Sequence, residues 1–81
     1  MNIHLRYFAS LREATGRDAE TLDVAAGSDV AAIRELLAEC YPSAAPILAR
    51  CAAALNRAYV AADTPLHDGD ELVFIPPVGG G

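Results

Sequence analysis

The sequence closes with LVFIPPVGGG, residues 72–81, and this stretch decides the fold and the function that we expect. Its first four residues are apolar at every position, which predicts a central strand. Two prolines follow, and each fixes φ near the polyproline value. The glycines come last and let a backbone pass where a Cβ atom would collide. When extended, residues 76–81 reach about 20 Å, so we interpret them as a tail that enters a narrow site on another protein.

The composition indicates one small folded domain. An apolar share of 53% over 81 residues favours a globular chain over a disordered one. No run approaches the roughly 18–20 apolar residues of a membrane span, and the first residues lack the pattern of a signal peptide. We therefore expect a cytoplasmic protein without a membrane partner.

The net charge is −5, and all six basic residues are arginine. These arginines are scattered and form no basic stripe, so we expect no nucleic-acid partner. An acidic surface suits a basic protein partner, and it also suits mere solubility. The absence of lysine excludes a P-loop lysine, a Schiff-base lysine and a lysine general base in this chain.

Hydrophobic periodicity predicts the order of strands and helices. Residues 2–8 alternate between an apolar and a polar face, as a half-buried strand does. Residues 30–40 repeat apolar side chains at helical spacing, and Pro42 ends this main helix. The remaining expected elements are a short helix over 9–15, a strand over 20–24, an irregular connection with a helical turn over 43–50, strands over 52–55 and 59–60, and a final strand over 71–75.

The compact solution for this order is the α+β fold called β-grasp, or ubiquitin-like. The first two strands pair as a hairpin, and a right-handed crossover through the main helix places a later strand parallel to the first. We expect a mixed four- to five-stranded sheet with one main helix packed across it. Residues 1–75 would form this domain and residues 76–81 a flexible C-terminal tail. If only one helix covers the sheet, part of its second face is exposed.

Phe8 interrupts the alternation of the first strand with a ring on or beside the polar face. One interpretation is that it starts the next element and turns inward. The other is that it helps to form a contact surface.

The chain behind the tail lacks a recognisable catalytic or metal-binding constellation. Residue types that often supply such sites are interpreted here as solvated, as free thiols, or as turn-forming. They are His4, His67, Cys40, Cys51 and the Asp68-Gly69-Asp70 turn.

The reactive group that remains is the α-carboxylate of Gly81. A carboxylate can attack the α-phosphorus of ATP, and a sulfur or nitrogen nucleophile can then open the acyl-adenylate. Bare glycines leave the carbonyl unshielded and let a partner close around the backbone. The alternative is an idle tail of no consequence.

Three segments resemble one known family. PLHDGDELVFIPPVGGG, residues 65–81, resembles the C-terminal pattern PLxDGDEVxFxPPVxGG of the molybdopterin synthase small subunit family. YFASLRE, residues 7–13, is similar to its FFAxxRE segment, and ALNR, residues 54–57, to its AVNxx turn. The double proline favours this family over the related thiamine-pathway carrier. Two departures are Gly79, which fills the variable position of VxGG, and Ile75, where an aromatic residue is common.

The resemblance implies a sulfur carrier that binds no cofactor itself. An E1-like adenylyltransferase would use ATP to adenylate Gly81, and a sulfur donor such as a cysteine desulfurase or rhodanese-like protein would supply sulfur for a C-terminal thiocarboxylate. The thiocarboxylate would donate that sulfur to precursor Z in molybdopterin biosynthesis. The chain would be the non-catalytic, sulfur-donating subunit, with the catalytic lysine on the large subunit. In that family two small subunits sit at opposite ends of a large-subunit dimer, a heterotetramer.

The resemblance also implies roles for particular residues. Gly81 reacts, the rest of the tail inserts into the large subunit, and a few residues of the domain contact the partner. The inserting residues are Pro76, Pro77, Val78, Gly79 and Gly80; the partner-binding residues are Phe8, Arg12, Phe74 and Ile75.

Three alternatives stay open. The chain could be a thiocarboxylate carrier of another pathway, such as thiamine, cysteine or tRNA thiolation. It could be a ubiquitin-like modifier conjugated to lysines of target proteins. It could also be a binding module whose tail has no role.

Overall fold

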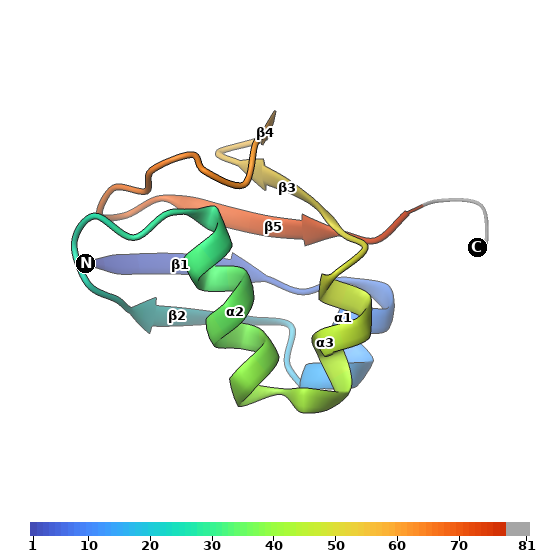
Figure 1. Cartoon of the computed structure of the whole chain (residues 1–81). Coiled ribbons are helices and arrows are strands. Elements are labelled where there is room, and N and C mark those ends of the chain that lie inside the picture. The colour runs from blue at the N-terminus through green and yellow to red at the C-terminus, as the bar shows by residue number, and fades with distance from the viewer. Residues whose placement is uncertain (78–81) are drawn as a thin grey trace.

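The computed structural model describes residues 1–77, which form a five-stranded sheet with helices on one face (Figure 1). The predicted elements are confirmed, with a 3-10 turn and a short helix in place of the irregular connection. In chain order the elements are β1 (Asn2–Arg6), α1 (Ala9–Thr15), β2 (Ala19–Asp23), α2 (Val30–Cys40), η1 (Pro42–Ala44), α3 (Ala45–Leu48), β3 (Ala52–Leu55), β4 (Ala58–Val60) and β5 (Glu71–Ile75).

The last strand is the middle of the sheet, as its apolar sequence predicts. The strand order is β2-β1-β5-β3-β4. β5 runs parallel to β1, with Leu5 opposite Leu72, and antiparallel to β3. β1 and β2 form the predicted antiparallel hairpin. This arrangement is the β-grasp fold, and it makes the chain leave the domain from its central strand.

The main helix covers one face of this sheet. The Asp29 side chain caps α2 by accepting a hydrogen bond from the Ala32 amide at 2.9 Å. The helix then buries Val30, Ile33 and Leu37 in the core. Other core side chains come from β1, α1, α3 and β5, and the largest of them are Ile3, Leu5, Leu11, Leu48, Leu72 and Phe74.

Two turns at the start of β5 are joined by hydrogen bonds. The Asn56 side chain donates to Asp70 Oδ1 at 2.9 Å and accepts from the Glu71 amide at 3.0 Å. The hydrogen bond from Asn56, then that from the His67 amide at 2.7 Å, lowers the pKa of Asp70. Among residues 1–77 no group of His, Cys, Asp or Glu side chains could hold a metal ion. Asp68 and Asp70 accept hydrogen bonds from the backbone amides of Asn2 and His67, which is the turn-forming role that the sequence predicts.

β5 ends at Ile75, and Pro76 and Pro77 follow it outside any helix or strand. Residues 78–81, to which the sequence assigns the inserted and reactive part of the tail, lie outside the described residues. Within residues 1–77 no helix is both long and apolar enough to cross a membrane.

Candidate functional site

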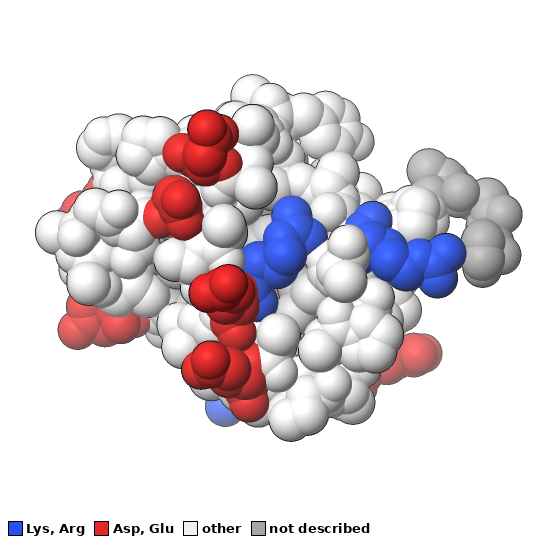
Figure 2. All heavy atoms as spheres, in the orientation of Figure 1, with Lys and Arg blue, Asp and Glu red and all other residues white. Residues whose placement is uncertain are grey.

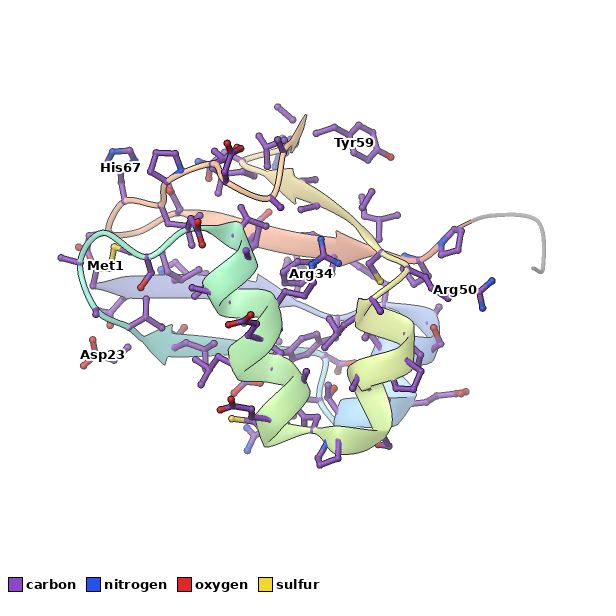
Figure 3. The ribbon with its side chains drawn as sticks, in the orientation of Figure 1. Met1, Asp23, Arg34, Arg50, Tyr59 and His67 are labelled. Carbon is purple, nitrogen blue, oxygen red and sulfur yellow. The ribbon has the colours of Figure 1, made fainter. Side chains whose placement is uncertain are left out.

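Contacts of the Arg34 side chain hold together the segments from which the tail begins. The Arg34 guanidinium of α2 donates hydrogen bonds to the carbonyl of Leu48 and, at 3.0 Å, to that of Cys51. Its Cζ also lies 4.8 Å from the ring centroid of Phe74, within cation–π range. Figure 3 shows Arg34 reaching from α2 towards β5 and the start of β3. One side chain thus joins α2, the end of α3 and the strand that carries the tail.

The position of Phe74 corrects one prediction from the resemblance. Phe74 was expected to face a partner, but only 1% of it is exposed. Side chains alternate along β5, and the sheet places Leu72 and Phe74 on the helix-covered face. Phe74 therefore packs in the core and supports the end of β5 at Ile75, which we call the root of the tail. It does not contact a partner from the surface.

Val73 and Ile75 point to the opposite, open face of the sheet and are half-buried. In the register of the sheet Val73 pairs with Ala54, Ala54 with Tyr59, and Ile75 with Ala52. Directly paired residues share a face, so these five form one apolar surface, which we call the open-face patch. Tyr59 on the edge strand β4 is its most prominent member, with 74% exposure (Figure 3). Ile75 is thus accessible on the open face, and its contact with a partner stays a prediction.

Phe8 is the second large exposed apolar side chain among the described residues. Its extended backbone forms the N-cap of α1, where its carbonyl accepts from the Leu11 and Arg12 amides. Leu11 fills the core at 0% exposure, whereas Phe8 remains 53% exposed. Phe8 therefore starts the next element, as one interpretation predicts, but it does not turn inward. Its role in a contact surface stays a prediction. Phe8 follows Arg6, the partner of Val73, by two residues and so lies at the end of the sheet from which the tail leaves.

Arg12 is also accessible, with 62% of its side chain exposed. Its guanidinium lies 3.7 Å from the Asp18 carboxylate, a surface ion pair that is worth little in water. Arg12 can therefore exchange this contact for a partner carboxylate or carbonyl at small cost.

The sequence analysis did not identify Arg34 or Tyr59 as site residues. Arg34 could be recognised only as a residue off the apolar face of the main helix, because both carbonyls that it binds come from a segment that had no firm predicted structure. Tyr59 had a signal, since it alternates with Val60 in a short strand and therefore points away from the core. Its exposure follows from β4 being the sheet edge.

Cys51, Tyr7 and Tyr41 provide no further reactive centre in the described part of the chain. Burial raises the pKa of the Cys51 thiol, which donates to the Ile47 carbonyl at 3.2 Å. Such a thiol is inert at neutral pH. Tyr7 and Tyr41 both donate to Glu20 Oε2 at 2.6 Å, which ties together the end of β1, β2 and the end of α2. This arrangement is structural.

The fold and the site define a ubiquitin-like β-grasp protein whose central strand is followed by Pro76 and Pro77 beside an apolar sheet face. The chain belongs to the ThiS family, whose model matches residues 5–81. It is 42% identical over 82 residues to the molybdopterin synthase sulfur carrier subunit of Escherichia coli K12, covering 98% of this chain and 99% of that protein. It is 32% identical to the protein of the same name from Chlamydomonas reinhardtii, with full coverage of both.

Solved structures agree with this assignment. A putative molybdopterin converting factor subunit 1 from Pyrococcus furiosus has a TM-score of 0.86 at 27% identity, over 95% of this chain and 98% of that one. A chain in the complex of subunits 1 and 2 of molybdopterin-converting factor from Helicobacter pylori has a TM-score of 0.75 at 29% identity, with full coverage of both. The resemblance and the β-grasp fold predicted from the sequence are confirmed.

Proposed function

We propose that this chain is the sulfur carrier subunit of a molybdopterin synthase. The observation that carries the proposal is full-length similarity, at 32–42% identity, to three proteins of that name. The described residues support this proposal, since they supply a packed scaffold and an exposed apolar surface. The chemistry then belongs to the Gly81 carboxylate and to the partners.

The reaction sequence begins with activation of the tail. A carboxylate oxygen of Gly81 attacks the α-phosphorus of ATP on an E1-like enzyme, and pyrophosphate leaves. The persulfide of a cysteine desulfurase or rhodanese-like donor then attacks the acyl carbon and displaces AMP. A thiol breaks the S–S bond of the resulting acyl disulfide, which releases the thiocarboxylate and leaves a disulfide on the donor side. The large subunit transfers this sulfur to precursor Z and returns the tail to a carboxylate. This chain acts as a co-substrate and does not bind ATP itself.

The docking surface for the large subunit is the open-face patch together with Phe8. The patch includes Ile75, so a partner that covers it also meets the start of the tail. Large exposed apolar side chains are common at the centre of protein interfaces. A structure of the two subunits in complex exists for the relative from Helicobacter pylori. We extend to this chain the family arrangement of two small subunits at opposite ends of a large-subunit dimer.

Genetic rescue tests the proposal and separates the alternatives. The gene is expressed in cells that lack their own molybdopterin synthase small subunit, and a molybdoenzyme activity is measured. We expect rescue by the full chain and none after deletion of Gly80-Gly81 or after Gly81→Phe, because a side chain at the last position blocks a narrow site. A parallel strain that lacks its thiamine-pathway carrier provides the control. Rescue of that strain alone would assign the chain to another sulfur pathway, and rescue by the deletion variant would show an idle tail.

A further inference from the structure

The chain contains no lysine, since all six of its basic residues are arginines. Lysine ε-amines are the usual acceptors when an activated C-terminal carbonyl is transferred to a protein. The remaining primary amine of this sequence is the α-amino group of Met1. The number and position of amines therefore decide whether an activated tail can react with its own chain.

The Met1 amine is held by the sheet. It donates a hydrogen bond to the Val24 carbonyl at 2.7 Å and lies 3.3 Å from Asp23 Oδ1. These contacts close the open end of the β1–β2 hairpin. Figure 1 shows the N-terminus and the end of β5 at opposite ends of the sheet. The Met1 amine is therefore hydrogen-bonded, and it lies at the end of the sheet opposite the root of the tail.

The basic groups close to the root of the tail are guanidinium groups. The Arg34 guanidinium donates hydrogen bonds to the carbonyls of Leu48 and Cys51. Arg50 is exposed and comes two residues before Ala52, which pairs with Ile75. Figure 3 shows Arg50 near the end of β5 and Arg34 nearer the middle of the molecule, and Figure 2 shows arginine side chains on this face. A guanidinium remains protonated in proteins and does not attack an acyl group as a free amine does.

We infer that the chain does not accept its own tail in an amide bond: its activated terminus forms no amide within the molecule or with a second copy. This inference rests on the proposed function, in which the Gly81 carbonyl is activated. It implies that every adenylate or thiocarboxylate ends in transfer to a partner or in hydrolysis. It also implies that replacing an arginine beside the root of the tail by lysine allows an internal amide to form.

The excluded reaction is aminolysis. An uncharged amine nitrogen attacks the terminal carbonyl carbon, a C–N bond forms, and the bond to sulfur or to the AMP oxygen breaks. The leaving group keeps the electron pair, and the proton of the amine passes to it or to water. Because the amide is stable, each such event removes one carrier permanently. With Cys40, whose thiol is exposed, the terminus would form only another thioester.

The test uses the full chain as a C-terminal thioester of a small thiol, prepared by intein cleavage. The thioester is incubated at mildly alkaline pH, treated with hydroxylamine to remove any remaining thioester, and weighed by intact-mass spectrometry. The wild-type chain is compared with Arg50→Lys, beside the root of the tail, and with Arg57→Lys. Arg57 lies in the β3–β4 turn, just past Leu55, which pairs with Leu72 near the other end of β5.

For the wild-type chain we expect the acid and the hydroxylamine product only. For Arg50→Lys we expect an additional species lighter than the acid by one water, the internal amide, in higher yield than for Arg57→Lys. An internal amide or a linked dimer from the wild-type chain would overturn the inference. So would the absence of amide from Arg50→Lys. Circular dichroism checks that the variants are folded.

The thioester is made without the activating enzyme, so the result does not depend on genetic rescue. Failed rescue with an amine-inert wild-type thioester would reject the proposed function alone. Successful rescue with self-acylation of the wild-type thioester would reject this inference alone.

Discussion

Arg34 performs several structural tasks at once. Its guanidinium satisfies two backbone carbonyls near the end of α3 and covers the Phe74 ring. Planar geometry with several fixed donors allows one arginine to make all three contacts, whereas a lysine ammonium is a point charge. The side chain thereby holds in place the strand from which the tail leaves.

Replacing Arg34 should therefore destabilise the domain. We expect Arg34→Met to lower the free energy of unfolding by about 1–3 kcal/mol, because two charge-assisted hydrogen bonds and a cation–π contact are lost. Arg34→Lys should fall between this variant and the wild type. Urea denaturation provides the measurement. A loss of less than about 0.5 kcal/mol for Arg34→Met would show that these contacts contribute no net stability.

Phe74 and Tyr59 form a matched pair of aromatic residues with opposite roles. Phe74→Ala should lower the free energy of unfolding by about 3–5 kcal/mol, since it leaves a cavity in the core. Tyr59→Ala should change stability by less than about 0.5 kcal/mol but weaken binding to the large subunit about tenfold, or 1.4 kcal/mol. Urea denaturation and isothermal titration calorimetry measure the two quantities. Unchanged affinity for Tyr59→Ala would place the interface elsewhere.

At the scale of secondary-structure elements, one carboxylate joins three parts of the fold. Glu20 on β2 accepts hydrogen bonds from Tyr7, just after β1, and from Tyr41, at the end of α2. Burial chiefly, and then the hydrogen bond to Glu20, raises the pKa of Tyr7. The hydrogen bond to Glu20 chiefly raises the pKa of Tyr41. Both hydroxyls therefore stay protonated in the folded state well into the alkaline range.

The raised pKa values predict how stability depends on pH. Below about pH 10 the tyrosines are neutral in both the folded and the unfolded state, so their stabilising contribution is complete. Above this pH the unfolded state loses protons first, and stability falls by about 1.4 kcal/mol per pH unit for each such tyrosine. Tyr7→Phe removes one of these two tyrosines. The variant should be less stable than the wild type at pH 7, and this difference in the free energy of unfolding should be smaller at pH 11. Urea denaturation at both pH values tests this, and no lysine titrates in the range. A constant deficit would contradict the prediction.

The order of the elements could be predicted because each has its own periodicity. The alternation in residues 2–6 and the helical spacing in α2 are local signals, and the structure confirms both. The outward-facing residues of β5 could not be predicted, because all four residues of LVFI are apolar. The pairing of β5 with β1 and β3 decides that Phe74 is buried and Ile75 lies on the open face. The contacts of Arg34 were equally hidden, since they join segments that are distant in sequence.

In the whole molecule, the folded domain holds the central strand from which the C-terminal tail leaves. A helix-covered core fixes the central strand, an apolar open face lies beside it, and the strand leads directly into the tail. The lysine-free sequence removes internal acceptors for an activated carbonyl. These features together suit a protein that delivers a reactive group to a partner.

Sulfur transfer from the tail to precursor Z can be followed on the carrier itself. The full chain is prepared with a Gly81 thiocarboxylate and mixed with the large subunit and precursor Z, and its intact mass is followed while molybdopterin is quantified. We predict that the carrier returns to the carboxylate mass, with oxygen in place of sulfur, in step with molybdopterin formation. A carrier that retains its sulfur, or molybdopterin formed equally well from the carboxylate form, would contradict sulfur donation by this chain.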